Sequence, residues 1–320
     1  MSAEKVSTSA KTAIGIAHSK FILIGEHAVV HGQPAIAIPF PLIGVESMIE
    51  YVPGPAILDS SFYYGPIHMT PKSLRGIADC ITDTLEYLEI PCENLVIRIN
   101  SSVPPGKGLG SSASVAVSVI RSLFNYAERE CTHEELLKLA DIAETYAHGS
   151  PSGIDTLTIT ANTPIWFEKN HPIERIAVKE DLHFLVADSG QDADTKSSVQ
   201  SVTDLLKKAP RTIQRKLDRI GQLTHEAKDA LEKASKHFLG TMLNEAQKEL
   251  EYLGVSDAVL NRLIRFARQE GALGAKLTGG GNGGCIIALA QNEVHCKQLA
   301  EKLKQFGAHS VWPFVLKKNG

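Results

Sequence analysis

The sequence has few cysteines, and none of them are paired at the spacing of a metal or redox site. There are five, an odd number, and no C-x-x-C pair occurs among them: Cys80, Cys92, Cys131, Cys285 and Cys296. Their scatter argues against a zinc ribbon and against a thioredoxin-type motif. Reduced thiols are typical of the cytosol, so we expect a cytoplasmic protein.

An excess of one charge is also missing. The 33 basic residues nearly balance the 36 acidic residues, for a net charge of −3. A dedicated nucleic-acid-binding protein usually carries a basic domain, and an acidic disordered tail would shift the balance the other way. We therefore expect no nucleic-acid partner.

Long hydrophobic runs are absent as well. The uncharged stretch 32–45 contains three prolines, and the stretch 277–292 contains five glycines. A membrane-spanning helix needs about 20 mostly apolar residues. Residues 1–10 are polar and have no apolar centre, unlike a secretory signal. We expect no membrane partner.

What the sequence does have is enough length for two domains. Its 320 residues correspond to about two domains of ~150 residues. Short apolar segments bounded by Gly and Pro predict strands in the first half, whereas helical periodicity dominates 207–269. We predict an α+β protein with domains at 1–180 and 181–320.

Individual helices and strands can be placed from the Gly, Pro and capping residues that bound them. We predict strands at 21–24, 35–38, 42–51 and 94–99, and helices at 73–88 and from residue 111. Thr132 and Glu135 form a capping-box pattern at the start of another helix. The helical region 207–269 divides into three stretches, with Ser256 as the expected cap of the third. Strands at 273–277, 285–290 and 311–316 and a helix at 293–306 complete the chain.

A glycine-rich loop, 104–110, separates the strand 94–99 from the helix that begins near Ser111. Glycines at such a junction let the backbone approach a ligand closely, and the helix N-terminus favours an anion. The spacing matches neither a Walker A loop nor the dinucleotide fingerprint. A glycine turn followed by a serine cap is the structural alternative.

A second glycine cluster occupies 278–284, with five glycines in Thr-Gly-Gly-Gly-Asn-Gly-Gly. So many glycines cost much backbone entropy on folding, and a simple hairpin needs only one or two. The cluster therefore favours a loop that faces a ligand.

Charged residues follow the first strand and the capped helix. Lys20 precedes the strand 21–24, and the Glu26–His27 pair follows it. Glu144 lies on the capped helix, and Asp155 comes after the next turn, where it could also cap a helix. Each residue alone has an ordinary structural reading. Together they allow one carboxylate to hold a cation and another to meet a substrate proton.

These features occur in the order found in the GHMP kinases. The segment Val103-Pro-Pro-Gly-Lys-Gly-Leu-Gly-Ser-Ser-Ala-Ser114 resembles the ATP-binding motif of that family. The segment from Lys20 to Gly32 resembles the first motif of the members that act on mevalonate. Residues 151–155, Pro-Ser-Gly-Ile-Asp, resemble the segment with the catalytic aspartate, and 278–284 resemble the third motif. The resemblance thus covers nearly the whole chain.

The resemblance implies a GHMP kinase fold: an N-terminal domain like ribosomal protein S5 domain 2, a ferredoxin-like C-terminal domain and an active site between them. It implies ATP-dependent phosphorylation of mevalonate to 5-phosphomevalonate, in isoprenoid biosynthesis, with Mg²⁺ as cofactor. Whether the protein forms a homodimer is left open.

The same resemblance assigns the site residues. It places Asp155 and Lys20 in catalysis, Ser112 and Glu144 on the metal, and Glu26, His27 and Thr195 near the substrate. The nucleotide would lie on Pro104, Pro105, Gly106, Lys107, Gly108, Leu109, Gly110, Ser111, Ser112, Ala113 and Ser114.

Two departures from the family pattern stand out. His18 and Ser19 replace the usual proline and glycine before the lysine, and Asn282 replaces a glycine of the third motif.

Two alternative functions are left open. The nearest is another GHMP kinase, such as one that acts on phosphomevalonate. The second is a catalytically silent nucleotide-binding protein on the same fold.

Overall fold

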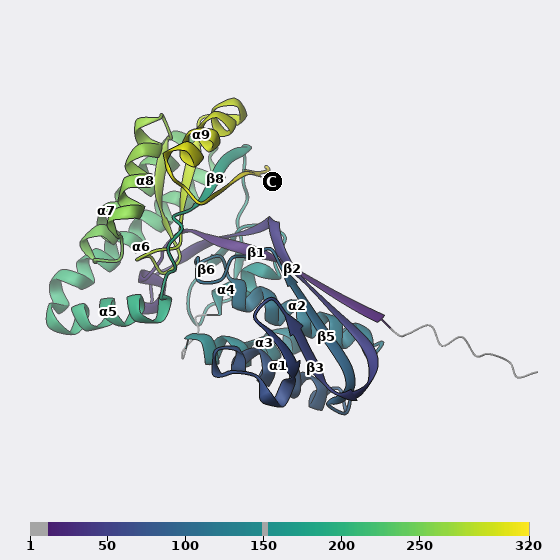
Figure 1. Cartoon of the computed structure of the whole chain (residues 1–320). Helices are drawn as coiled ribbons and strands as arrows, with labels where there is room; N and C mark the ends of the chain where they lie inside the picture. Colours follow the sequence, from purple (N-terminus) through teal and green to yellow (C-terminus); the bar gives the residue numbers. More distant parts are fainter. Residues whose placement is uncertain (1–11, 149–152, 320) are drawn as a thin grey trace, which may run out of the picture. The chain divides into compact units, whose positions relative to one another are not determined.

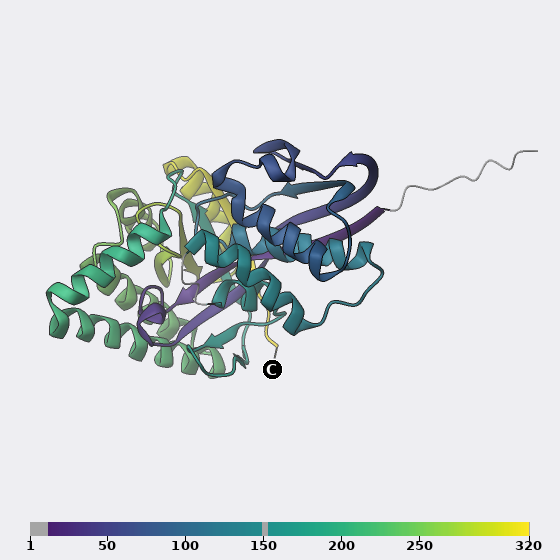
Figure 2. The same cartoon turned by 90° about the horizontal axis from the view of Figure 1, so that it is seen from below.

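Residues 12–148 and 153–319 are described by the structure, a computed structural model (Figure 1). They fall into two units. The first unit comprises residues up to 18, 43–102 and 112–156, and the second comprises 19–42, 103–111 and the chain from residue 157 onward. The long strands β1 (Thr12–Ile24) and β2 (Ala35–Pro55), purple in Figure 2, therefore supply residues to both units.

The first unit combines a sheet with three helices. Its part of β2 pairs antiparallel with β5, and β3 lies parallel to β5 and antiparallel to β4. These strands and helices are β3 (Ile57–Ser60), β4 (Tyr63–Pro66), β5 (Glu93–Ser101), α1 (Arg75–Tyr87), α2 (Ser111–Tyr126) and α3 (His133–His148). Short 3₁₀ turns occupy Ile67–Met69 and Lys72–Leu74.

Strand β2 joins two segments that the sequence predicts as separate strands. Pro39 and Pro41 suggested a break, but the strand continues through both. They fall between the ladder of residues 35–37 with β6 and the ladder that begins at Val45 with β5. Proline lacks the N–H that a ladder needs, so it is tolerated between these two ladders.

The capping box at the start of α3 is confirmed. The backbone N–H of Thr132 donates to Oε2 of Glu135 at 2.9 Å, and the N–H of Glu135 donates to Oγ1 of Thr132 at 3.3 Å. The reciprocal bonds satisfy two donors that a helix start otherwise leaves unpaired.

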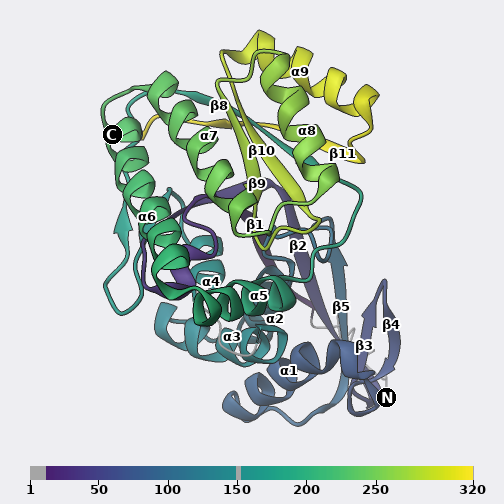
Figure 3. The same cartoon turned by 90° about the vertical axis from the view of Figure 1, so that its left-hand side faces the viewer.

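The second unit contains a four-stranded antiparallel sheet in the order β11-β8-β10-β9. Helices α7, α8 and α9 lie over it (Figure 3), and every side chain of β10 is buried. The bounds are β8 (Leu182–Asp188), β9 (Gly274–Thr278), β10 (Cys285–Ala290), β11 (Ser310–Leu316), α7 (Lys236–Tyr252), α8 (Ala258–Gln269) and α9 (Glu293–Phe306). The predicted strands and helix after residue 273 are confirmed.

Further elements of the chain are short, except for two helices. These elements are a 3₁₀ turn at Ala28–His31, α4 (Ile154–Ile159), β6 (Ile165–Phe167), β7 (Glu174–Arg175), α5 (Thr195–Lys208) and α6 (Pro210–Glu232). The sequence did not predict α5, which is mostly polar and fully buries only Ser198 and Val202, although Val202, Leu205 and Leu206 recur at helical spacing.

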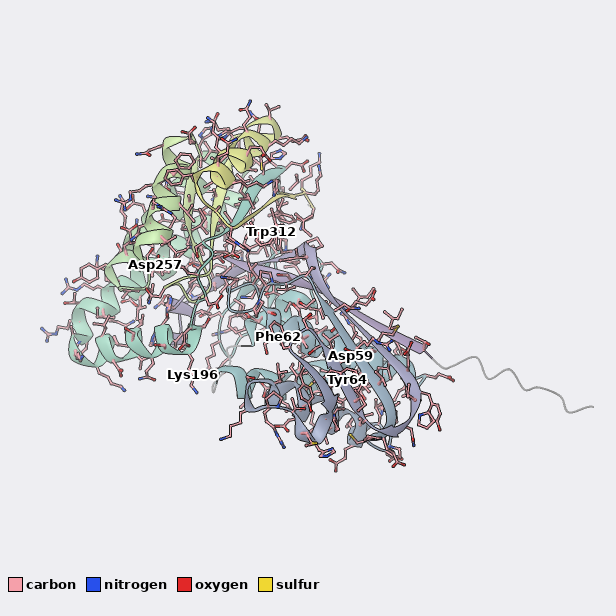
Figure 4. All side chains as sticks on the ribbon, in the orientation of Figure 1. Asp59, Phe62, Tyr64, Lys196, Asp257 and Trp312 are labelled. Atoms are coloured by element: carbon pink, nitrogen blue, oxygen red, sulfur yellow. The ribbon has the colours of Figure 1, made fainter. Side chains whose placement is uncertain are left out.

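The predicted cap of α8 is wrong by one residue. The carboxylate of Asp257, labelled in Figure 4, accepts from the N–H groups of Val259 and Leu260 at 2.7 and 2.9 Å. The hydroxyl of Ser256 instead donates to Oδ1 of Asn261 at 2.7 Å. A carboxylate at the N-cap also gains from the helix dipole.

None of the helices in the described residues is long and apolar enough to cross a membrane.

Candidate functional site

Two glycine loops of the second unit pack backbone against backbone. Gly106, Gly108 and Gly110 of the first glycine loop (Pro104–Gly110) all have positive φ, from 67° to 76°. A Cβ on Gly108 would lie 2.9 Å from the carbonyl oxygen of Thr278, and one on Gly279 would lie 2.6 Å from Cα of Gly108. The glycines are needed because the second glycine loop (Thr278–Gly284) leaves no room for side chains.

Lys20 is tied to the first glycine loop. Its side chain is buried, its Nζ donates to the carbonyl of Gly108 at 3.3 Å, and its backbone N–H donates to the carbonyl of Leu109 at 3.3 Å. Ser19 donates its hydroxyl to the same Leu109 carbonyl at 2.7 Å. The serine that departs from the family pattern thus fixes the lysine segment to the loop.

Asn282, the other departure, takes over a backbone role of glycine. Its φ is 50°, in the left-handed region that asparagine tolerates better than most residues. Its N–H donates to the carbonyl of Val255 at 2.8 Å. The loop therefore keeps its turn without a glycine at this position.

Glu26 forms a buried ion pair with Lys276. The two side chains are 1% and 0% exposed, and Nζ of Lys276 bonds Oε1 of Glu26 and the carbonyl of Leu277. Burial raises the pKa of Glu26, and Lys276 opposes that shift. Burial lowers the pKa of Lys276, and Glu26 opposes it. In the described part of the chain, Oε2 of Glu26 has no hydrogen-bond partner.

His27 presents a second buried acceptor. Burial lowers its pKa to about 4, although the bond to Gly280 works in the opposite direction, so the ring is neutral at pH 7. Its Nε2 lies 3.0 Å from the carbonyl oxygen of Gly280 and must carry the proton, since a carbonyl only accepts. Nδ1 is then an acceptor, buried and without a partner among the described residues. His27 also has φ 61°, a strained value for a residue with a side chain.

Thr195 lies against the second glycine loop. It is the first residue of α5, which Asp194 caps by accepting from the N–H of Ser197 at 3.0 Å. A Cβ on Gly280 would lie 2.7 Å from Oγ1 of Thr195. The second unit therefore brings Thr195, Lys20 and the Glu26–His27 pair to the two glycine loops.

The other predicted site residues belong to the first unit. Ser112, Ala113 and Ser114 form the first turn of α2, where the hydroxyl of Ser114 donates to the carbonyl of His18 at 3.0 Å. Ser112 is half-buried. The backbone of Glu144 lies in α3, but its side chain is outside the described residues, as are Pro151 and Ser152.

Asp155 is half-buried and lies within the first turn of α4. The suggestion that it caps a helix is therefore wrong: the helix begins at Ile154, after Gly153 at φ 80°.

A magnesium site can be judged by the chemistry of its donors. Within residues 12–148 and 153–319, the described side chains form no group of three His, Cys, Asp or Glu that could hold a metal ion. The predicted pair is different in kind, because Ser112 offers a hydroxyl oxygen and Glu144 a carboxylate. Hard oxygen donors fit Mg²⁺, which keeps several waters and is completed by substrate phosphates.

Lys276 is the residue that sequence reasoning missed. Its only signal was a lysine inside an otherwise apolar strand, β9, directly before the second glycine loop. A lysine within a buried strand needs a carboxylate partner, but nothing local identifies Glu26, 250 residues earlier.

Comparison with known proteins gives consistent matches. The model of the GHMP kinases N terminal domain matches residues 74–162, and that of the GHMP kinases C terminal domain matches 202–309. A mevalonate kinase of Pyrococcus furiosus is 34% identical over 304 residues, which cover 88% of this chain and 90% of that protein.

Solved structures agree. The L. major mevalonate kinase in complex with R-mevalonate superposes with a TM-score of 0.84 at 27% identity, covering 98% of each chain. The mevalonate kinase of Staphylococcus aureus MRSA252 superposes with a TM-score of 0.73 at 32% identity, covering 96% of this chain and 99% of that one.

Proposed function

Because this chain belongs to the GHMP kinase family and matches its mevalonate kinases over most of its length, we propose that it phosphorylates (R)-mevalonate with ATP. The product is 5-phosphomevalonate, an intermediate of isoprenoid biosynthesis. The observation that carries the proposal is that one unit joins Lys20, the Glu26–His27 pair and both glycine loops.

The Glu26–His27 pair supports a substrate with hydroxyl groups. Oε2 of Glu26 and Nδ1 of His27 are buried acceptors without partners among the described residues. A buried acceptor left unpaired costs about 1–3 kcal/mol, so a ligand hydroxyl that donates to it gains that amount. Mevalonate carries two hydroxyls besides its carboxylate.

The first glycine loop and α2 suit the nucleotide phosphates. The positive φ values of Gly106, Gly108 and Gly110 are conformations that glycine adopts without strain, and α2 begins immediately afterwards at Ser111. The N–H groups and dipole of a helix start favour a phosphate. Ser112 and Glu144 would hold Mg²⁺, which neutralises phosphate charge and polarises the transferred group.

Asp155 and Lys20 would act on the reacting hydroxyl. Phosphoryl transfer has a loose transition state, so the protein mainly positions the groups and stabilises charge. Asp155 would orient the 5-hydroxyl of mevalonate and accept its proton. Lys20, held by the carbonyl of Gly108, would favour the developing negative charge.

A coupled ADP-release assay with mevalonate, phosphomevalonate, homoserine and galactose, offered separately, tests the proposal. We expect turnover with mevalonate alone. Turnover with phosphomevalonate instead would indicate the alternative kinase, and no ADP above background with any of the four would indicate a silent nucleotide-binding protein.

A substitution tests the role of Asp155. Asp155→Asn should lower kcat by about 10³-fold, within the usual range for a lost general base, while nucleotide binding persists. Asp204→Asn, at an exposed ion pair of α5, is the matched control and should keep normal turnover. Near-normal turnover of Asp155→Asn would remove the catalytic role.

A further inference from the structure

Lys107 lies in the middle of the first glycine loop, yet its amine faces the protein's own carboxylates. Its side chain is only 8% exposed, with Nζ 2.9 Å from Oδ1 of Asp192 and 3.4 Å from Oδ1 of Asp188. Burial by itself would lower the pKa of Lys107, but Asp192 and Asp188 together outweigh it and raise that pKa. The lysine is thus a charged tether within the loop.

Asp188, one of the two partners of Lys107, has a fixed position in the sheet. It is the last residue of β8, in register with Cys285 of β10 and Ser310 of β11. Its side chain is 2% exposed, and its Oδ1 also accepts from the N–H of Gly190 at 2.8 Å. This carboxylate therefore lies at the end of an inner strand of the four-stranded sheet.

Asp192 lies on the short segment 189–194, which connects that sheet to α5. The N–H of Ala193 donates to the carbonyl of Gly106 at 2.7 Å, and the carbonyl of Gln191 accepts from the N–H of Gly284 at 2.8 Å. The segment thus contacts both glycine loops. It ends at Asp194, the cap of α5, directly before Thr195.

The side chain of Asp192 is 86% exposed, so packing does not hold it in place. Its partner Lys107 is nearly buried and is drawn inward by Asp188. The ion pair therefore adds a side-chain link to a segment whose backbone already contacts both glycine loops, and it does so at the point where the first glycine loop meets the start of α5.

We propose that Lys107, Asp188 and Asp192 form a latch that positions the first glycine loop and the start of α5 for nucleotide binding. Lys107 is a positioning residue: its charge is used by the two carboxylates and not by the nucleotide phosphates. The latch rests on the nucleotide-binding role proposed above for this loop.

Calorimetric binding of the non-hydrolysable analogue AMPPNP with Mg²⁺ tests the latch without mevalonate. We compare the full-length protein with Lys107→Met, Asp192→Asn, the double variant and Lys107→Arg. Lys107→Met should weaken binding by about tenfold and Asp192→Asn by about fivefold, in line with a partly buried ion pair. The double variant should be no weaker than Lys107→Met, and Lys107→Arg should stay within about threefold of the wild type.

Steady-state kinetics give a second readout. The KM for ATP should rise in step with the loss of AMPPNP affinity, while kcat changes less than about threefold. Lys207→Met and Asp204→Asn disrupt an exposed pair on α5 and serve as matched controls that should change neither quantity.

Opposite effects of the two single variants would overturn the latch. If Lys107 used its charge on the phosphates, Asp192→Asn would free the amine and leave binding unchanged or tighter, while Lys107→Met would still lose affinity. Additive losses in the double variant would also refute it. Because Asp192 is so exposed, its variant keeps the test decisive even where Lys107→Met folds poorly. A wild type that binds no AMPPNP would overturn both the latch and the nucleotide-binding proposal.

Discussion

Replacing Lys276 with methionine should destabilise the protein in a pH-dependent way. The variant leaves the carboxylate of Glu26, 1% exposed, without its bond to Nζ. In this variant the Glu26 carboxylate takes up a proton when the protein folds, because an unpaired buried charge is unfavourable. Moving a group of ordinary pKa 4.5 to its neutral form costs about 1.4 kcal/mol per pH unit above that value. The penalty is therefore about 3.4 kcal/mol at pH 7 and about 0.7 kcal/mol at pH 5.

The partner variant should show the opposite pH dependence. Glu26→Gln leaves Lys276 buried with only its bond to the Leu277 carbonyl. An ordinary lysine, with a pKa of 10.5, must lose its proton to become neutral, which costs at most about 4.8 kcal/mol at pH 7 and about 2 kcal/mol at pH 9. The stability of Glu26→Gln should thus recover as pH rises, while that of Lys276→Met recovers as pH falls.

Guanidinium titrations at pH 5, 7 and 9 measure these free energies of unfolding. The double variant Glu26→Gln/Lys276→Met should return to within about 1 kcal/mol of the wild type, since neither charge remains. Lys317→Met breaks an exposed pair with Asp181 and should cost less than about 1 kcal/mol. The same penalty at all three pH values, or a double variant as unstable as the two single penalties combined, would refute the reasoning.

Three substitutions test the loops. Gly108→Ala should lower AMPPNP affinity by tenfold or more in calorimetry, because its Cβ would lie 2.9 Å from the Thr278 carbonyl at a φ of 76°. Ser19→Ala should cost about 1 kcal/mol in a guanidinium titration, since it removes the 2.7 Å bond to Leu109. Asn282→Ala should cost about 1 kcal/mol more than Asn282→Gly in the same titration, because alanine resists positive φ; equal stability of the two would contradict the left-handed turn.

The parts of the fold that the sequence predicted correctly are mostly those with short-range sequence patterns. The capping box of Thr132 and Glu135 and the strands around 278–284 follow from short-range patterns and are confirmed. Helix α5 was missed because it buries little. The predicted domain boundary at residue 180, the cytoplasmic location and a homodimer stay predictions.

The sequence by itself determined where a backbone must come close to another group. A glycine loop is recognisable without a structure, because tolerance of positive φ and the lack of a Cβ atom are properties of the glycine residue itself. Gly106, Gly108 and Gly110 use that tolerance, since all three have positive φ. The same holds for Lys20 and the Glu26–His27 pair, whose positions beside a strand mark them as candidates.

Only the tertiary structure decided what the buried charges face. Lys276 pairs with Glu26 across 250 residues, and Lys107 turns from the loop to Asp188 and Asp192. The sequence alone does not distinguish a solvated lysine from one that binds phosphate or one that pairs with a carboxylate inside the protein. Its partner depends on which carboxylate the folded chain buries beside it, because desolvation makes the ion pair necessary only there.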